Sequence, residues 1–192
     1  MNILELSAYF YPNNGGIETV IKNLSTLWSK KEHNVTVITS NQGSTKSYDC
    51  LGGIKGRIKS GIKIYYLKSF IVMRDVIIPS LSKKIRQIHK KNKFDIALIH
   101  HPHAFLLFTA AYACKKNKIP YCVHMHGREL ILPGWRKILT TIYNTIFLKY
   151  TLKHAEKIFI CVDKIRHQSK ILRKNKYKNK LITIPHGINL NK

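Results

Sequence analysis

Acidic residues are scarce in this chain. Its 192 residues include nine Asp and Glu against 34 Lys and Arg, which gives a formal net charge of +25. Such a charge selects partners but does not determine a fold. It favours nucleic acid, an anionic membrane surface or a polyphosphate ligand, and a lysine-rich solvated surface is the alternative. No paired carboxylates and no Ser/His/Asp order stand out, so neither type of catalytic site is indicated.

Cysteine is also rare, and it lacks the spacing of a metal or redox motif. The four cysteines include no CxxC pair. Cys122 and Cys161 lie within short apolar runs. This pattern predicts buried, reduced thiols in a cytoplasmic protein, and it argues against a disulfide framework or a zinc site built on cysteine.

Long apolar runs are missing as well. The most apolar segment, "AFLLFTAAYAC" from Ala104, is about half of the roughly 20 residues that a transmembrane helix needs. The first residues lack the basic region of a signal peptide. The sequence therefore predicts neither a signal peptide nor a membrane span.

What the chain does contain is a regular alternation of short apolar runs and helical patterns. Apolar runs predict strands at 2–8, 34–40, 61–68, 94–100, 120–126, 157–162 and 181–185. Apolar residues at helical spacing predict helices from Gly16 onward and at 80–91, 104–116, 134–155 and 163–174, whereas 41–60 is predicted to be a loop. This order predicts an α/β domain with a doubly wound, mostly parallel, Rossmann-like sheet and helices on both faces.

Two adjacent glycines, Gly15 and Gly16, stand where the first strand passes into the first helix, in "YFYPNNGGIETV". The segment is not a Walker A loop, because no GK[ST] follows, and it is not a GxGxxG fingerprint. Free backbone N–H groups at a helix N-terminus favour an anion such as phosphate. The alternative is a tight turn with positive φ. The local pattern leaves both interpretations open.

Histidines follow two of the predicted strands, in "HHPHA" (His100, His101 and His103) and in "HMHGRE" (His124 and His126). In a doubly wound sheet, ligands bind beyond the carboxyl ends of the strands. One interpretation is metal binding, although no carboxylate or thiol joins these residues at ligand spacing. A second is hydrogen bonding to a hydroxylated substrate, with His126 at the mouth of the cleft. A third is that some of them, His124 above all, are merely buried.

Taken in order, these segments resemble glycosyltransferase family 4. The resemblance is carried by "PNNGGIETVIKNLSTLWSKKEHNVTVITS", "FDIALIHHPHA", "PYCVHMHGREL", "IFICVDKIRHQ" and "LITIPHGINLNK". It covers the whole chain in the expected order. The departures are Glu32 for a glycine, Asp163 for a serine, His186 for an asparagine and Asn189 for an aspartate.

The resemblance implies one half of a GT-B fold, in which two Rossmann-like domains face a cleft. Residues 1–184 would be the N-terminal, acceptor-side domain, and residues 185–192 the start of the interdomain linker. The E-x7-E motif of the nucleotide-sugar domain does not occur, so the C-terminal domain is expected to be absent. The implied activity is retaining transfer from a nucleotide-sugar to a glycan or lipid-linked acceptor, with no cofactor and no essential metal.

Site residues follow from the resemblance by position. Gly15 and Gly16 would approach the diphosphate of the donor, and His126 would be catalytic, in contact with the reacting sugar or its acceptor. The implied acceptor-side residues are Asn14, His101, His103, Arg128 and Glu129.

The resemblance also offers an explanation for the positive net charge, because many members of this family act on lipid-linked acceptors. The predicted helix at 134–155 mixes Trp135 and Ile138 with Arg136 and Lys137. A basic amphipathic surface of this kind favours peripheral binding to the inner face of the cell membrane. The alternative is that its apolar stripe is core and its lysines are solvated.

Two further functions stay open. The chain could be a non-catalytic subunit of a two-chain transferase that needs a partner chain. It could also be a basic nucleic-acid-binding module. The second is disfavoured, because no RNP, zinc-finger or helix-turn-helix signature occurs and aromatic residues are not interleaved with the basic runs.

Overall fold

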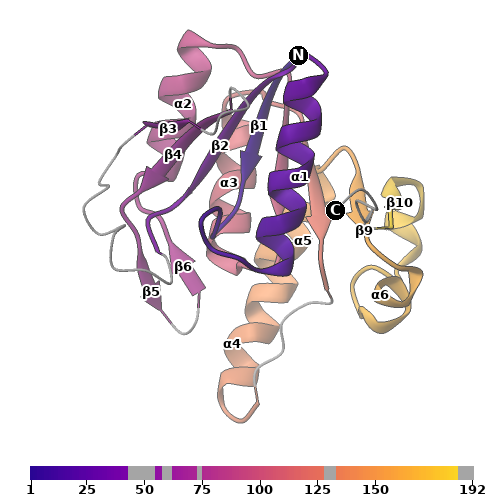
Figure 1. Ribbon diagram of the computed structural model, residues 1–192. Helices are drawn as coiled ribbons and strands as arrows, with labels where there is room; N and C mark the ends of the chain where they lie inside the picture. Colours follow the sequence, from indigo (N-terminus) through magenta and orange to yellow (C-terminus); the bar gives the residue numbers. More distant parts are fainter. Residues whose placement is uncertain (43–54, 58–61, 73–74, 128–132, 186–192) are drawn as a thin grey trace.

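The computed structural model describes residues 1–42, 55–57, 62–72, 75–127 and 133–185. Strands and helices alternate along the chain (Figure 1). The strands are β1 (Asn2–Leu6), β2 (Asn34–Ser40), β3 (Lys55–Arg57), β4 (Lys63–Leu67), β5 (Phe70–Val72), β6 (Asp75–Ile77), β7 (Ile96–His100), β8 (Tyr121–Met125), β9 (Ile158–Ile160) and β10 (Leu181–Thr183). The helices are α1 (Gly16–Lys30), α2 (Leu81–Lys91), α3 (Ala104–Lys116), α4 (Arg136–Tyr143), α5 (Lys149–His154) and α6 (Asp163–Gln168). A π-helical segment, η2 (Asn144–Leu148), joins α4 to α5, and a 3₁₀ segment, η3 (Asn175–Lys180), precedes β10.

The described strands form one main sheet with the order β10-β9-β8-β7-β1-β2-β4-β3, beside a separate β5–β6 hairpin. All neighbours in the main sheet are parallel except β3, which pairs with β4 in the antiparallel sense. From β1 the chain moves outward to β2 and β4, and it then returns to β7 on the other side of β1. The loops after β1 and β7 therefore diverge, and this switch point is where doubly wound sheets bind ligands. The predicted fold class is confirmed.

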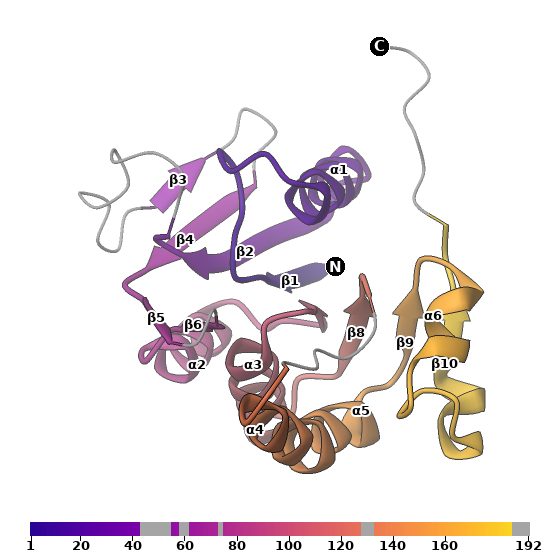
Figure 2. The same cartoon turned by 90° about the horizontal axis from the view of Figure 1, so that it is seen from below.

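Helices cover both faces of the sheet. Helix α1 lies on one face, and α2, α3 and α5 lie on the other (Figure 2). On the first face Ile21 of α1 packs with Val37 and Ile64. On the second face the buried residues include Leu107 and Ala110 of α3. The sequence of α3 is apolar on nearly every side, which predicted a buried helix. Six of its 13 residues are buried, whereas Phe105 and Tyr112 are exposed.

Four elements differ from the sequence prediction. The predicted loop at 41–60 contains β3, and the rest of that loop after residue 42 lies outside the described residues. The β5–β6 hairpin was not predicted; in the sequence its apolar residues are interrupted by Arg74 and Asp75. The helix predicted at 134–155 contains the π-helical segment η2. The helix predicted at 163–174 ends at Gln168, because Ser169 Oγ accepts the N–H groups of Ile171 and Leu172 in place of a helical turn.

The described helices include none whose length and apolar character would let it cross a membrane.

Candidate functional site

The N-terminus of α1 lies at the carboxyl end of β1. Gly15 is the N-cap of this helix and has an extended backbone (φ −125°, ψ 174°). Gly16 is the first helical residue. Among the described glycines, positive φ occurs at Gly134. The positive-φ turn that the sequence allowed is therefore wrong for both glycines, and their lack of a side chain needs another reason.

The two glycines differ in what surrounds them. A Cβ added to Gly15 would collide with the carboxylate of Glu18, which lies over this residue from the first turn of α1. A Cβ added to Gly16 would meet nothing within 4 Å. The chain's own carboxylate thus takes the place of an anion at Gly15, whereas the backbone at Gly16 is open to close approach. An anionic ligand at Gly15 requires the Glu18 side chain to move.

A pocket of about 360 Å³ opens beside this helix start. Its lining residues are Tyr9, Asn13, Asn14, Gly15, Glu18, Gln42 and Ile71. The side-chain amide of Asn13 donates to the carbonyl of Gln42 (3.1 Å), and the side-chain amide of Gln42 donates to the carbonyl of Ser69 (2.9 Å). These bonds tie the β1–α1 loop to the ends of β2 and β4. The pocket brings together two residues predicted for the site, Asn14 and Gly15.

A second group lies within the sheet, on the face that carries α1. His100 ends β7 and is in register with His124 of β8. His126 follows β8 directly, two residues after His124, and shares its face of the sheet. The Nδ1 atom of His100 lies 3.0 Å from Nε2 of His126, and the rings of His124 and His126 have centroids 4.1 Å apart. We call these three residues the histidine cluster.

A buried carboxyl group stands behind the histidine cluster. Glu5 of β1 has no solvent exposure, and its Oε1 lies 3.5 Å from Nε2 of His100. Its Oε2 accepts a hydrogen bond from Ser25 of α1. Glu5 was not predicted as a site residue, because it lies inside an apolar run. Its signal in the sequence is that one of the few acidic residues occupies a core position of the first strand.

Burial shifts the protonation of this pair. It raises the pKa of Glu5 to about 8, against the smaller lowering effect of the Ser25 hydrogen bond. It lowers the pKa of His100 to about 3. At pH 7 the contact therefore joins two neutral groups. The tautomers of His100 and His126 decide which of the two rings donates the hydrogen bond between them.

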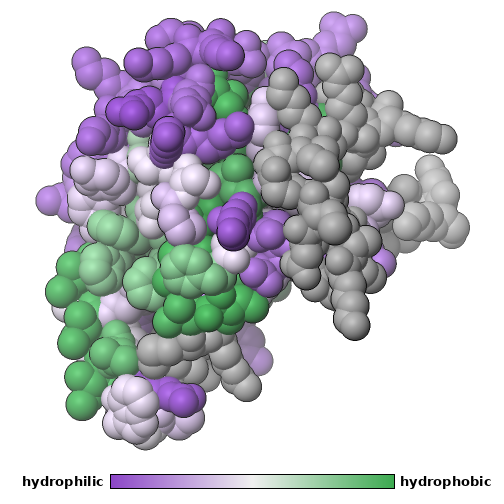
Figure 3. All heavy atoms as spheres, turned by 90° about the vertical axis from the view of Figure 1, so that its left-hand side faces the viewer, coloured by the Kyte–Doolittle hydropathy of each residue, from purple (hydrophilic) through white to green (hydrophobic). Residues whose placement is uncertain are grey.

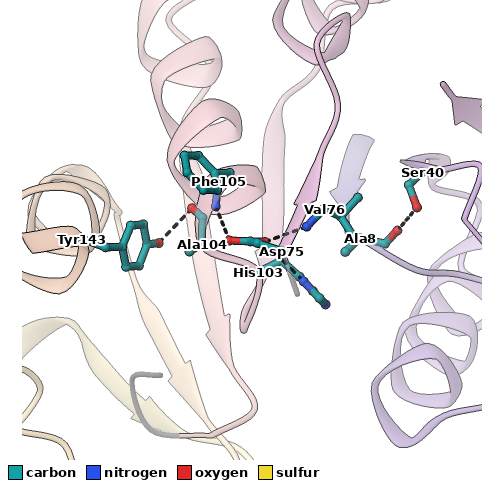
Figure 4. A network of polar contacts seen from close by, with 8 residues as sticks. All are labelled: Ala8, Ser40, Asp75, Val76, His103, Ala104, Phe105 and Tyr143. Atoms are coloured by element: carbon teal, nitrogen blue, oxygen red, sulfur yellow. Dashed lines mark hydrogen bonds and ion pairs between the residues drawn. The ribbon is translucent and has the colours of Figure 1, made fainter. Parts of the chain in front are cut away.

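Asp75 organises a third group, on the other face of the sheet (Figure 4). Its carboxylate accepts the N–H groups of Val76 (2.9 Å) and Phe105 (3.0 Å), and it lies 3.4 Å from Nδ1 of His103. His103 is the N-cap residue of α3, and its ring makes an edge contact with the pocket residue Tyr9. Asp75 thereby joins the β5–β6 hairpin to the start of α3 and orients His103 beside the pocket.

The remaining residues predicted for the site are placed as follows. His101 is buried, and burial, with a smaller contribution from His103, lowers its pKa to about 4. Its ring lies beneath the surface of the cleft, and its role toward an acceptor stays a prediction. Arg128 and Glu129 lie outside the described residues.

Solved structures share this fold. The chain superimposes over its full length on 45% of the Anabaena protein Alr3699/HepE, solved in complex with UDP, with a TM-score of 0.67 and 15% identity. It superimposes over 98% of its length on 48% of sucrose-phosphate synthase from Thermosynechococcus elongatus, with a TM-score of 0.65 and 9% identity. The fold is one Rossmann-like half of the GT-B architecture.

The family follows from the sequence comparison. The family model described as Glycosyltransferase Family 4 matches residues 14–192, so the chain belongs to this family. It is 24% identical over 190 residues to the phosphatidylinositol N-acetylglucosaminyltransferase GPI3 subunit of Saccharomyces cerevisiae, covering 97% of this chain and 39% of that protein. It is 26% identical over 175 residues to a phosphatidylinositol N-acetylglucosaminyltransferase subunit of Homo sapiens, covering 90% of this chain and 34% of that protein. The chain thus spans about two fifths of the length of these relatives.

Proposed function

We propose that this chain is the acceptor-side half of a retaining glycosyltransferase that moves a sugar from a nucleotide-sugar to a lipid-linked acceptor. The observation that carries the proposal is the family match over residues 14–192, which begins at the helix start whose backbone is open at Gly16. Both relatives are named as phosphatidylinositol N-acetylglucosaminyltransferase subunits, and these names support a lipid acceptor.

The roles proposed for the site residues are those that the resemblance implies. The open backbone at Gly16 receives the leaving diphosphate, because such a group needs preorganised hydrogen-bond donors rather than a strong base. His126 contacts the reacting sugar or its acceptor. Asn14, which lines the pocket, and His103, which contacts the pocket residue Tyr9, bind the acceptor. This chemistry requires no cofactor and no essential metal, and Arg128 and Glu129 keep the acceptor-side role that the resemblance implies.

A donor-binding partner completes the site. The chain aligns with two fifths of its relatives, and no E-x7-E motif occurs in it. We propose that a nucleotide-sugar domain, on the same polypeptide or on a partner chain, closes over the carboxyl edge of the sheet. The relatives are themselves named as subunits, which supports the alternative that this chain is the non-catalytic member of a two-chain transferase.

Membrane association at the cytoplasmic face is part of the proposal. The apolar stripe of α4 is exposed rather than packed in the core: Trp135 and Ile138 are 68% and 66% exposed. Phe70 and Ile71 of β5 are exposed as well. Figure 3 shows apolar side chains gathered at the lower end of the molecule. With Arg136 and Lys137 on the same helix, this surface suits an anionic bilayer, in which each cation contributes about 1 kcal/mol.

Binding of a soluble, short-chain phosphatidylinositol to the purified chain tests the acceptor role without the donor domain. We expect saturable binding that His126→Ala and His103→Ala weaken, while His167→Ala on the exposed face of α6 leaves it unchanged. Binding that is insensitive to both site variants would contradict the proposal.

A further inference from the structure

We propose that the histidine cluster binds a divalent transition metal ion, with Zn²⁺ as the best match to its ligands. In the described part of the chain, His100, His124 and His126 are the one group of three His, Cys, Asp or Glu residues placed to share an ion. Each offers a ring nitrogen, and these atoms lie within 4.8 Å of one another. No such ion is part of the sugar transfer proposed above. His126 belongs to both proposals, and metal binding is measured without sugar donor or acceptor, so that either proposal can fail alone.

The parallel sheet brings the three rings together. The register of β7 on β8 sets His100 beside His124, and the two-residue period of β8 adds His126 on the same face. Nδ1 of His100 and Nε2 of His126 are 3.0 Å apart. Two nitrogens on one tetrahedral Zn²⁺ with bonds of about 2.0–2.1 Å lie about 3.4 Å apart. The pair His100–His126 is slightly closer than this, and the three nitrogens lie within 4.8 Å of one another, so the rings must rotate toward a common centre to bind the ion.

The carboxyl group of Glu5 supplies the support that histidine ligands normally have. A histidine that binds a metal through one nitrogen usually directs the other to a carboxylate, which fixes the orientation of the ring. His100 directs Nδ1 into the cluster and Nε2 toward Oε1 of Glu5, and Ser25 holds the other oxygen of Glu5. The sequence alone hides this carboxylate, because β1 and β7 are neighbours only in the folded sheet.

The ligand set indicates which ions fit. Three imidazoles suit Zn²⁺, Cu²⁺, Ni²⁺ or Co²⁺, whereas Mg²⁺ prefers oxygen ligands. Three protein ligands leave a fourth position open to water or another ligand. His100 and His124 are buried and His126 is half-buried, so the ion enters from the His126 side. The site is therefore distinct from any Mg²⁺ that accompanies a nucleotide diphosphate.

Zinc titration of the purified, EDTA-treated chain tests the site. In competition with a chromophoric chelator, we expect one tightly bound Zn²⁺ per chain, with Co²⁺ giving the visible absorption of a tetrahedral complex. His126→Gln should abolish the tight site, because it removes one of the three ligands. The variant should still fold, because His126 is half-buried and lies at the end of β8. Glu5→Gln should weaken it about 10–100-fold, the usual effect of losing a partner behind a ligand. His167→Gln, on an exposed helix face, is the matched control.

The outcomes separate this site from adventitious binding, because the chain has ten histidines in all. Zn²⁺ should also raise the melting temperature of the wild type and of His167→Gln, but not that of His126→Gln, since only a ligand that binds the native state stabilises it. Absence of a saturable site, equal affinity in His126→Gln and His167→Gln, or unchanged affinity in Glu5→Gln would overturn the proposal. Circular dichroism of each variant establishes that it is folded.

Discussion

At the residue scale, the start of α1 contains two glycines with opposite surroundings. Glu18 covers Gly15, and nothing covers Gly16. A side chain at Gly16 therefore costs the folded chain little but stands where we propose that the diphosphate binds. A substitution at Gly16 can therefore test donor binding without a large loss of stability, and Gly16 is the better of the two glycines to mutate.

We expect Gly16→Val, in an enzyme completed by its donor domain, to raise the KM for the nucleotide-sugar at least tenfold or to abolish turnover. The free energy of unfolding should change by no more than about 0.5 kcal/mol, as for other surface substitutions. Thr19→Val, one turn further along the exposed side of α1, is the control and should leave the KM unchanged. Unaltered donor kinetics in a folded Gly16→Val enzyme would remove the glycines from the donor site.

Cys114 gives a second prediction at this scale. It is fully buried in α3, and burial raises the pKa of its thiol to about 12. At pH 8 about one thiol in 10⁴ is then ionised, compared with roughly a quarter for a free cysteine with a pKa near 8.5. We expect iodoacetamide to leave Cys114 unmodified in the native chain and to modify it in guanidinium chloride, as peptide mass spectrometry would record. Native modification at the rate of a free thiol would contradict its burial.

At the element scale, the sequence predicted those elements whose apolar residues form an uninterrupted run or a helical pattern. The bounds of β2 and α3 match the prediction to the residue. In the β5–β6 hairpin Arg74 and Asp75 interrupt the apolar residues, and Asp75, which organises the start of α3, was missed with it. The histidines of the candidate site were visible in the sequence. Their partner Glu5 was not, because only the pairing of β1 with β7 brings it close.

We expect Asp75→Ala to destabilise the fold by about 1–3 kcal/mol, the cost of leaving buried hydrogen-bonding groups unpaired. The N–H groups of Val76 and Phe105 both lose their acceptor, and the hairpin loses its link to α3. Urea denaturation measures the loss. Asp95→Ala is the control, because Asp95 accepts one backbone N–H at an exposed position that water can replace. Equal losses for the two variants would mean that the Asp75 contacts contribute little.

Helix α4 carries the prediction about membranes. Replacing both Trp135 and Ile138 with Ser should lower the affinity for vesicles containing phosphatidylserine at least tenfold, because burying a large apolar side chain contributes about 1.5–3 kcal/mol. The double change Val162→Ser and Ile184→Ser removes two exposed apolar side chains away from α4 and is the control. Sedimentation with vesicles at two salt concentrations measures the affinity. Unchanged vesicle binding, or an α4 surface that instead captures the donor domain, would contradict membrane docking.

At the scale of the whole molecule, we propose that the chain forms one wall of a cleft. Of the predicted site residues, Asn14 and Gly15 line the pocket beside α1, and His126 belongs to the histidine cluster. A transferase needs a second surface to hold the nucleotide-sugar against this wall. The sequence predicted the fold and indicated the carboxyl edge of the sheet, because both follow from the alternation of elements. The sequence could not predict how a nucleotide-sugar binds at this edge, because donor binding depends on residues other than those that form this sheet.

The purified 192-residue chain is therefore expected to show no detectable sugar transfer, even with nucleotide-sugar and acceptor at saturating concentrations. Without a donor domain, no preorganised group holds the sugar near its acceptor, and the loss of proximity alone amounts to about 7–11 kcal/mol of barrier. Adding a separately purified nucleotide-sugar domain should restore turnover, and the same addition to His126→Ala should not. Release of nucleotide and labelled lipid product would be measured together. Transfer by the chain alone would show that it contains a complete active site.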